Sequence, residues 1–373
     1  MMISNRKSLP LIIVLLTIVF FGGLIVLAVK KSSQATAETI SSRQKIVSVQ
    51  FKLLKKITSK YLNNPFDLFV DSSQNIFVAD QSSNYPILAL DYRGNLKNGI
   101  GKRGRGPGEM EKLYYILGAH QNTISILNLT QLKIQTFNYT GTILFEENIP
   151  FSLNGTIKNN VIHLIDGGNS HLISTFKLKK ENSQYQLVKL WELPLKKFAQ
   201  IESFLNISKN PLLKQGKIVS DANNTVFLAF SYSSLLLGIS SHGEYLFHNW
   251  LPYNIKFPDF TKYGKQYQHT APPVNEFPFV TIDLAVDSLY LYRVYIGFRT
   301  DKIKNPMALM KKDLGQGTIL DVYNKSNGQY LFSTKLPIPA KALWVTTDKI
   351  YILTTYPEIG ISIYEKPQEF YSL

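Results

Sequence analysis

Beyond residue 45 the chain alternates between short apolar runs and polar turns, and it has no long stretch of helical periodicity. One pattern, a short apolar strand directly after a polar turn, occurs six times. Most of these turns contain Asn or Asp, whose side chains bond to the nearby backbone and tolerate positive φ. The pattern predicts an all-β fold built from six similar units. The six runs are residues 75–78, 123–126, 161–164, 225–228, 288–291 and 349–352.

A second pattern, G-x-x-L-F-x-x-x-[IL]-P, starts at a glycine turn and ends at a proline. It occurs at residues 141–150, 243–252 and 328–337, and residues 185–194 keep only its ending. The first pattern repeats every 38 to 64 residues. Propeller blades are about 40–50 residues long, so we predict a six-bladed β-propeller with insertions in its later blades.

The last predicted blade ends at residues 361–364 without an outer strand. An open sheet edge invites pairing with other chains, so a closed ring needs a strand from elsewhere. Residues 46–58 form a strand-like run before the first blade, and we predict that they supply this edge. The propeller domain is therefore expected to span residues 46–373.

Residues 99–109, GIGKRGRGPGE, contain the letters of a G-x-G-x-x-G dinucleotide fingerprint. That fingerprint requires a buried strand before it and a helix after it. Here a polar turn precedes Gly99, and Pro107-Gly108 follows, which does not suit a helix interior. The segment also lacks the GK[ST] of a phosphate-binding loop. We therefore interpret it as a connection between blades.

The segments around this loop carry a family resemblance: NPFDLFVD (64–71), NIFVAD (75–80), ILALDYRG (87–94) and GKRGRGPGE (101–109). Together they resemble an NHL repeat, and the glycine-rich ending resembles exported six-bladed β-propeller proteins of bacteria. The resemblance implies a six-bladed propeller, often outside the cytoplasm, with members that bind ligands and only some that are enzymes.

Four side chains of this first blade have candidate roles. Asp80 and Glu109 are expected to accept backbone hydrogen bonds. Arg103 and Arg105 are candidate contacts for an anionic ligand, and the alternative is a solvated loop.

The first 30 residues predict a membrane anchor. Residues 9–29 are uncharged and almost entirely apolar, long enough as a helix for a hydrocarbon core of about 30 Å. We interpret residues 1–30 as an N-terminal membrane anchor, an uncleaved signal whose residues 9–29 form the transmembrane helix, and residues 31–45 as a polar linker. Cleavage after residues 35–37 is the alternative. Either way, the propeller is expected to be extracytoplasmic, in the periplasm or on the cell surface.

The chain has a formal net charge of +15 and no cysteine. Disulfides and thiolate chemistry are therefore excluded. A basic exterior favours binding of anionic partners. The alternative is that the lysine-rich surface is only solvated. Among anionic partners, nucleic acid is the least favoured, because the predicted anchor places the domain outside the cytoplasm.

The candidate chemistry is scattered. None of the six histidines pairs with another at metal-ligand spacing. Carboxylates on or beside inner strands, Asp67, Asp80 and Asp283, are candidates for a divalent cation in the central channel. No other cofactor is predicted. The alternative role for these carboxylates is hydrogen bonding within turns and strands.

Two insertions stand out from the blade pattern. Residues 195–217 predict a short amphipathic helix, and residues 251–280 form a long irregular segment between blades four and five. Long loops on rigid scaffolds often carry binding sites. The candidates for stacking on a sugar or peptide, or for packing on the propeller itself, are Tyr253, Tyr263, Tyr267 and His269.

The sequence as a whole predicts a membrane-anchored binding protein whose partner is a glycan, a peptide or an envelope protein. The alternative is a metal-dependent enzyme of the lactonase or lyase kind, with its site in the central channel.

Overall fold

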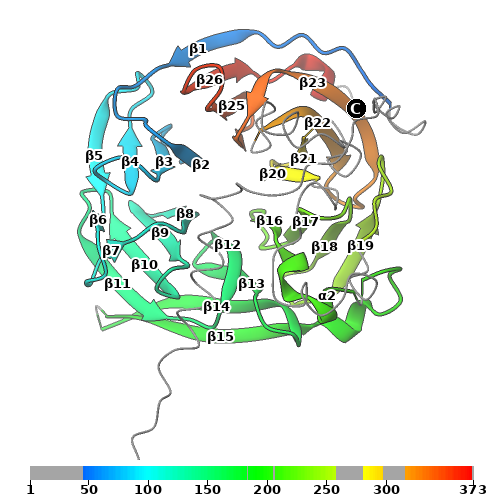
Figure 1. Cartoon of the computed structure of the whole chain (residues 1–373), viewed down its shortest axis with the longest axis horizontal. Helices are drawn as coiled ribbons and strands as arrows, with labels where there is room; N and C mark the ends of the chain where they lie inside the picture. The colour runs from blue at the N-terminus through cyan, green and yellow to red at the C-terminus, as the bar shows by residue number, and fades with distance from the viewer. Residues whose placement is uncertain (1–44, 183, 205, 258–279, 297–315, 372–373) are drawn as a thin grey trace, which may run out of the picture.

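The computed structural model describes residues 45–182, 184–204, 206–257, 280–296 and 316–371. In these residues the strands form six four-stranded antiparallel sheets and one two-stranded sheet. The six large sheets are arranged as blades around a common axis (Figure 1). The predicted six-bladed propeller is therefore confirmed.

The first three blades follow one another along the chain. Blade 1 contains β2 (Pro65–Val70), β3 (Ile76–Asp80), β4 (Ile87–Leu90) and β5 (Leu96–Ile100). Blade 2 contains β8 (Tyr114–His120), β9 (Thr123–Asn128), β10 (Lys133–Asn138) and β11 (Ile143–Asn148). Blade 3 contains β12 (Ser152–Lys158), β13 (Val161–Asp166), β14 (His171–Glu181) and β15 (Gln184–Pro194).

The remaining blades complete the ring. Blade 4 contains β16 (Gly216–Ser220), β17 (Val226–Phe230), β18 (Leu236–Ile239) and β19 (Tyr245–Asn249). Blade 5 contains β20 (Thr281–Val286), β21 (Tyr290–Tyr295), β22 (Gly317–Asn324) and β23 (Tyr330–Ala340). Blade 6 contains β24 (Ala342–Val345), β25 (Lys349–Thr354), β26 (Gly360–Glu365) and β1 (Leu53–Ile57).

The two sequence patterns correspond to fixed positions in the blades. The six apolar runs after polar turns overlap the second strand of each blade, and the glycine-to-proline pattern covers the outer strands β11, β19 and β23. Side chains set the turns as expected. Asp71 accepts hydrogen bonds at 2.8 Å from both the backbone N–H and the side-chain amide of Asn75. Asp221 accepts the backbone N–H groups of Asn223 and Thr225 at 2.9 Å each.

The hydrophobic core lies between the blades. The buried apolar side chains of the described residues form six clusters, and each joins residues of two neighbouring blades. In β3 and β17, for example, every residue is buried. This explains why these runs lack strict alternation, since both faces of such a strand pack against apolar neighbours.

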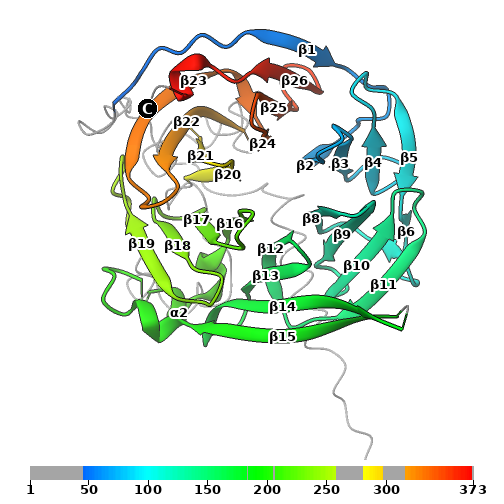
Figure 2. The same cartoon turned by 180° about the vertical axis from the view of Figure 1, so that it is seen from behind.

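The ring is closed by the N-terminal strand. β1 pairs antiparallel with β26, with Ile57 opposite Ile361, and becomes the outer strand of blade 6. Before β1, the backbone N–H of Val47 donates to Ser333 O at 2.8 Å in the outer strand of blade 5. Figure 2 shows this segment, in blue, running along the rim past the red strands of blade 6. The predicted closure by residues 46–58 is confirmed.

The glycine-rich loop connects β5 of blade 1 to β8 of blade 2. It contains β6 (Lys102–Arg103) and β7 (Glu109–Met110), which pair parallel, and no helix follows it. The Glu109 carboxylate accepts the Gly106 N–H at 2.7 Å. A Cβ at Gly104, where φ is +147°, would lie 2.1 Å from Glu109 Oε2, so this turn needs glycine. The expected role of the segment as a blade connection is confirmed.

Two further predictions concern helices. The predicted helix within 195–217 takes the form of three short turns: η1 (Leu195–Phe198), α2 (Asn206–Lys209) and η2 (Pro211–Lys214). In the part of the chain that the structure describes, no helix is long and apolar enough to cross a membrane. The predicted anchor at 9–29 and the linker up to residue 44 lie outside the described residues.

The closing strand offers a matched test of the fold. Ile57 is 2% exposed and packs into the cluster between blades 6 and 1, whereas Leu53 of the same strand is 52% exposed. We expect Ile57→Ala to lower the free energy of unfolding by about 2–4 kcal/mol. Leu53→Ala should change it by about 0.5 kcal/mol or less. Urea denaturation measures both free energies of unfolding. Equal losses in the two variants would contradict a ring closure that depends on burial of Ile57.

Candidate functional site

Four inner strands bring ionisable side chains together near the axis of the ring. They are Asp67 on β2, Tyr115 on β8, Lys217 on β16 and Asp283 on β20, here called the axial cluster. The ammonium of Lys217 lies 3.2 Å from Asp283 Oδ1 and 5.7 Å from the centre of the Tyr115 ring. The Asp67 charge also interacts with Lys217 and Asp283. The structure therefore brings together two of the three carboxylates that the sequence predicted.

Local irregularities in the inner strands position these carboxylates. The pairing register shifts between Pro65 and Asp67, and again between Thr281 and Asp283. Asp67 accepts the backbone N–H of Ile116 at 2.9 Å, and Asp283 accepts that of Leu343 at 2.7 Å. Each carboxylate thus binds the inner strand of the next blade.

Blade 3 repeats this arrangement with an amide. The register shifts between Ser152 and Asn154, and the Asn154 side chain donates to Gly216 O of blade 4 at 2.9 Å. Alternate blades therefore use an Asp or Asn on the inner strand to hold the following blade. These hydrogen bonds fix the axial cluster on a rigid scaffold.

The charges of the axial cluster are unequal. Burial raises the pKa of Asp67 from 3.8 to about 6, opposed by the attraction of Lys217 and assisted by the repulsion of Asp283. Burial alone would lower the pKa of Lys217, but the attraction of Asp283 and Asp67 outweighs it and raises that pKa. Burial likewise raises the pKa of Tyr115. The Lys217 ammonium therefore pairs with Asp283 and also attracts the charge of Asp67.

Asp80 belongs to a different set of contacts. It ends β3, is fully buried, and accepts backbone N–H bonds that hold two turns together. The donors are Asn63 at 2.7 Å, Asn64 at 3.0 Å, and Ser82 and Ser83 at 2.8 Å each. These contacts support the structural role expected for Asp80, and its carboxylate is not part of the axial cluster.

The two arginines of the glycine-rich loop differ in their surroundings. The guanidinium of Arg103 donates to the backbone carbonyls of Ser83, Glu111 and Asp80, and it lies 5.5 Å from the Tyr114 ring centre. Arg105 is exposed and pairs with the Glu111 carboxylate. Arg103 thus has its donors occupied within the protein, while Arg105 faces solvent.

Tyr253 packs on the propeller. Its hydroxyl donates to Asp321 Oδ1 at 2.8 Å, and its ring lies 4.0 Å from that of Tyr295. Asp321 in turn pairs with Arg293 at 3.1 Å, and both of these side chains are fully buried. Tyr253 therefore packs on the propeller itself, which is the alternative to stacking on a sugar or peptide. Tyr263, Tyr267 and His269 lie outside the described residues.

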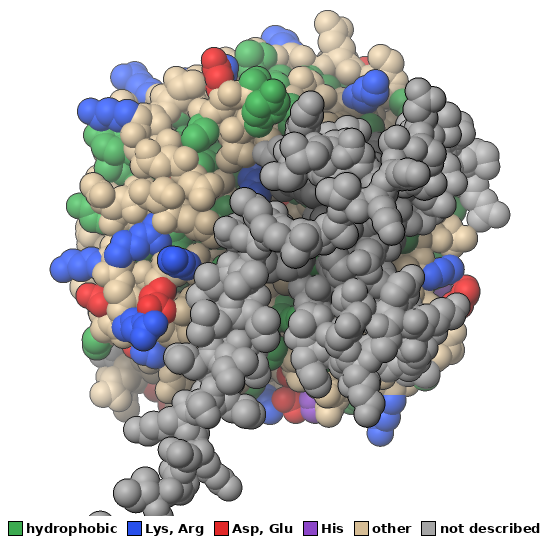
Figure 3. Space-filling view, viewed as in Figure 1, with side chains coloured by type: hydrophobic (Ala, Val, Ile, Leu, Met, Phe, Trp, Pro, Cys, Tyr) green, Lys and Arg blue, Asp and Glu red, His purple; other side chains and the backbone are tan. Residues whose placement is uncertain are grey.

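The basic side chains can be followed on one face of the molecule. On the face shown in Figure 3, lysine and arginine side chains lie around the rim, interspersed with acidic and uncharged atoms. A continuous positive groove is the feature that tracks a nucleic-acid backbone. The visible described surface has no such stripe.

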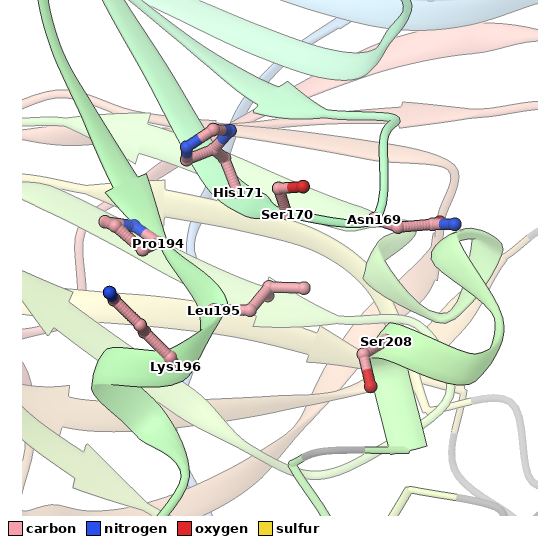
Figure 4. Close-up of a pocket in the computed structure, with 7 residues that line it drawn as sticks. All are labelled: Asn169, Ser170, His171, Pro194, Leu195, Lys196 and Ser208. Carbon is pink, nitrogen blue, oxygen red and sulfur yellow. The ribbon is translucent and has the colours of Figure 1, made fainter.

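A second group of potential metal-ligating side chains lies on blade 3. Asp166, His171 and Glu192 each place a potential metal-ligating atom within 4.8 Å of the others. His171 also lines a pocket of about 450 Å³. Figure 4 shows this pocket, with Pro194, Leu195 and Lys196 on one side and Ser208 opposite.

Sequence reasoning missed both Lys217 and this group. A lysine in a strand has no spacing that distinguishes it from a solvent-facing one. Asp166, His171 and Glu192 come from three successive strands, and only sheet pairing brings them together. The weak available signal was that each lies near a strand end.

The axial cluster predicts an unusual pH dependence of stability. Because the pKa of Asp67 is raised, the folded state binds this proton more tightly than the unfolded state. The contribution of Asp67 to stability is therefore greatest below about pH 4 and is lost as the pH rises to about 6. We expect the melting temperature of the wild type to fall, relative to that of Asp67→Asn, between these pH values. Calorimetry measures these melting temperatures. Glu244→Gln, a substitution at an exposed residue, is the control and should follow the wild type. Parallel curves of melting temperature against pH for all three proteins would contradict the raised pKa of Asp67.

The two arginines provide a second test. Arg103→Met removes the guanidinium donors of the Ser83 and Glu111 carbonyls and leaves the Asp80 carbonyl with the Tyr114 hydroxyl alone, so we expect a loss of about 2–4 kcal/mol in the free energy of unfolding. Arg105→Met should change stability by about 0.5 kcal/mol or less. Urea denaturation measures both. Wild-type stability of Arg103→Met would instead favour a role for Arg103 in ligand contact alone.

Comparison with known proteins agrees with the fold. No protein of curated function matches the sequence. A member of the duf4221 family from Bacteroides vulgatus ATCC 8482 superposes with a TM-score of 0.53 at 11% identity, covering 86% of this chain and 98% of that one. An exported-protein candidate from Bacteroides fragilis NCTC 9343 superposes with a TM-score of 0.49 at 12% identity, covering 86% and 95%. At these identities the likeness concerns the fold alone.

The sequence itself matches one family model. This model, DUF5128, is described as a 6-bladed beta-propeller and matches residues 34–243. The matched region covers more than half of the chain and includes blades 1 to 3 and most of blade 4. The chain therefore belongs to the DUF5128 family of six-bladed β-propellers.

Proposed function

We propose that this protein is a membrane-anchored, extracytoplasmic binding protein whose axial cluster binds a cationic group of its ligand. The observation that carries the proposal is that two carboxylates, those of Asp67 and Asp283, interact with a single ammonium, which pairs directly with Asp283 alone. Among the partners considered from the sequence, a peptide or envelope protein with an exposed amine or guanidinium fits this charge best.

The charge balance of the axial cluster favours a cation. With both carboxylates ionised, the cluster carries one more negative than positive charge, in surroundings that disfavour charge. A ligand ammonium or guanidinium would supply the missing charge, and such contacts strengthen where water is scarce. The Lys217 ammonium lies 5.7 Å from the centre of the Tyr115 ring, so an aromatic side chain also borders the cluster.

The cluster is reachable and rigid. Asp67 and Tyr115 are partly exposed, and the Lys217 side chain is 19% exposed. Backbone hydrogen bonds to Ile116 and Leu343 hold both carboxylates in place before any ligand arrives. Preorganisation of this kind reduces the entropy lost on binding.

The alternative is a lactonase or lyase type of enzyme with a divalent cation in the channel. In the axial cluster, Lys217 already provides a positive charge to the carboxylates that such a cation would need. This arrangement favours the binding role. An enzymatic activity that depends on a divalent cation would favour the enzyme instead.

The location follows from the N-terminal region. The apolar segment 9–29 has the length of a transmembrane helix. The Ser333 N–H of the outer strand of blade 5 donates to Lys45 O, so the polar linker 31–45 would join the anchor to the rim of the propeller. We also infer that blade 1 is of the NHL type, from its sequence pattern over residues 64–109.

A peptide screen tests the binding role. Full-length protein in detergent is titrated with a panel of lysine- and arginine-containing peptides, with acetylated and acidic peptides as comparison, and with neutral glycans. We expect a basic peptide to bind. Asp67→Asn and Asp283→Asn should each raise its dissociation constant at least about tenfold, because a desolvated charge pair is lost.

The control for this screen is Glu244→Gln, which should bind like the wild type. Affinity should also rise from about pH 5 to pH 7, as Asp67 loses its proton. An unchanged dissociation constant in both Asp67→Asn and Asp283→Asn would overturn the proposal. Binding of neutral or acidic compounds alone would also overturn it.

A further inference from the structure

We propose that blade 3 carries a divalent-cation site formed by Asp166, His171 and Glu192, and that Zn²⁺ is the cation its donors fit best. This site is independent of the axial cluster and of the function proposed for it. It consists of one imidazole and two carboxylates near the edge of a pocket.

Sheet pairing builds the site. Asp166 ends β13, His171 begins β14, and Glu192 lies near the end of β15. Ser174 of β14 pairs with Leu164 on one side and with Glu192 on the other. Paired residues share a face, and Asp166 lies two residues after Leu164, so the two carboxylates flank Ser174 on one face of the blade. The register shift between His171 and Ile173 occurs where the imidazole joins them.

The separation between His171 and Glu192 is compatible with coordination of one ion by both. His171 Nε2 lies 4.0 Å from Glu192 Oε2, too far for a hydrogen bond. A Zn–N bond of about 2.0–2.1 Å and a Zn–O bond of about 2.0–2.2 Å together span at most about 4.3 Å. One ion can therefore reach both atoms, and a small inward movement of these partly exposed side chains would bring the bonds to tetrahedral angles.

Neighbouring groups hold the donors in position. The Ser174 hydroxyl donates to Asp166 Oδ2 at 3.1 Å, and Gly168 N–H donates to Asp166 Oδ1 at 2.7 Å. The buried ammonium of Lys214 donates to the backbone carbonyls of His171, at 2.7 Å, and of Gly168. These contacts fix the loop between β13 and β14, which is how outer groups usually orient metal ligands.

Two lysines compete with a cation, and neither blocks it. Lys189 pairs with Glu192 Oε1 at 2.7 Å, but its side chain is 52% exposed, and such surface pairs contribute little. Lys214 lies 3.8 Å from Asp166 and is held by carbonyls instead. Their charges weaken cation binding without occupying His171 Nε2 or Glu192 Oε2.

The donor set selects the metal. Carboxylates alone suit Mg²⁺ and Ca²⁺, whereas an imidazole among them favours a transition-metal ion such as Zn²⁺. His171 also lines the 450 Å³ pocket (Figure 4). Three protein ligands leave a fourth position of a tetrahedral zinc ion for water or a ligand.

Zinc binding by the whole protein tests this site. Full-length protein in detergent is stripped with EDTA and dialysed against graded ZnCl₂, and bound zinc is measured by elemental analysis. We expect one Zn²⁺ per chain and a higher melting temperature with zinc, because a cation that binds only the folded state stabilises it. His171→Ala and Glu192→Gln should each raise the dissociation constant about a hundredfold or more, since loss even of an outer group costs 10–100-fold.

The matched control is His242→Ala, which removes an exposed histidine from the β18–β19 turn and should bind zinc like the wild type. Equal melting temperatures of the zinc-free wild type and His171→Ala would show that the variant is folded. When Co²⁺ replaces Zn²⁺, the wild type should show the visible absorption of a tetrahedral site, and His171→Ala should not. Failure of the wild type to take up zinc would overturn the proposal, as would undiminished uptake by His171→Ala.

Discussion

The structure depends on ring closure by backbone pairing between the two ends of the chain. β1, from the N-terminal side, completes the sheet that the last three strands begin. Without it, β26 would present an open edge, and the apolar cluster between blades 6 and 1 would lose Ile57. All six apolar clusters lie between blades, so each blade is stable only with a neighbour on both sides. Closure is therefore a condition for the whole core.

A second constraint acts at the axis, where the same side chains have a structural role and the binding role that we propose. Asp67, Asn154 and Asp283 each reach from an irregular point of one inner strand to the backbone of the next blade. These bonds hold alternate blades to their neighbours. They also leave two carboxylates close to a single lysine in a poorly solvated place. The charge imbalance that we assign to ligand binding thus arises from residues that the fold already needs.

The two proposed sites use the scaffold differently. The axial cluster combines side chains of four blades, so its geometry depends on the complete ring. The proposed cation site lies within one blade, between adjacent strands whose pairing is local. A change that loosens the ring should therefore disturb the first site more than the second. The pocket next to His171 is lined by residues of blade 3 and of the helical insertion that follows it.

The sequence by itself determined the number of blades, the position of the second and outer strands, the closing strand and the meaning of the glycine-rich loop. Each of these depends on local pattern: apolar runs, Asn and Asp turns, glycine and proline. Sequence reasoning also identified Asp67 and Asp283 as carboxylates of inner strands. Only the tertiary structure decided that Lys217 joins them, that Asp80 serves two turns, and that Arg103 binds backbone carbonyls. It alone assembled Asp166, His171 and Glu192. The reason is physical, because charge pairing and metal ligation depend on distances across blades and strands, and no spacing along the chain encodes those distances.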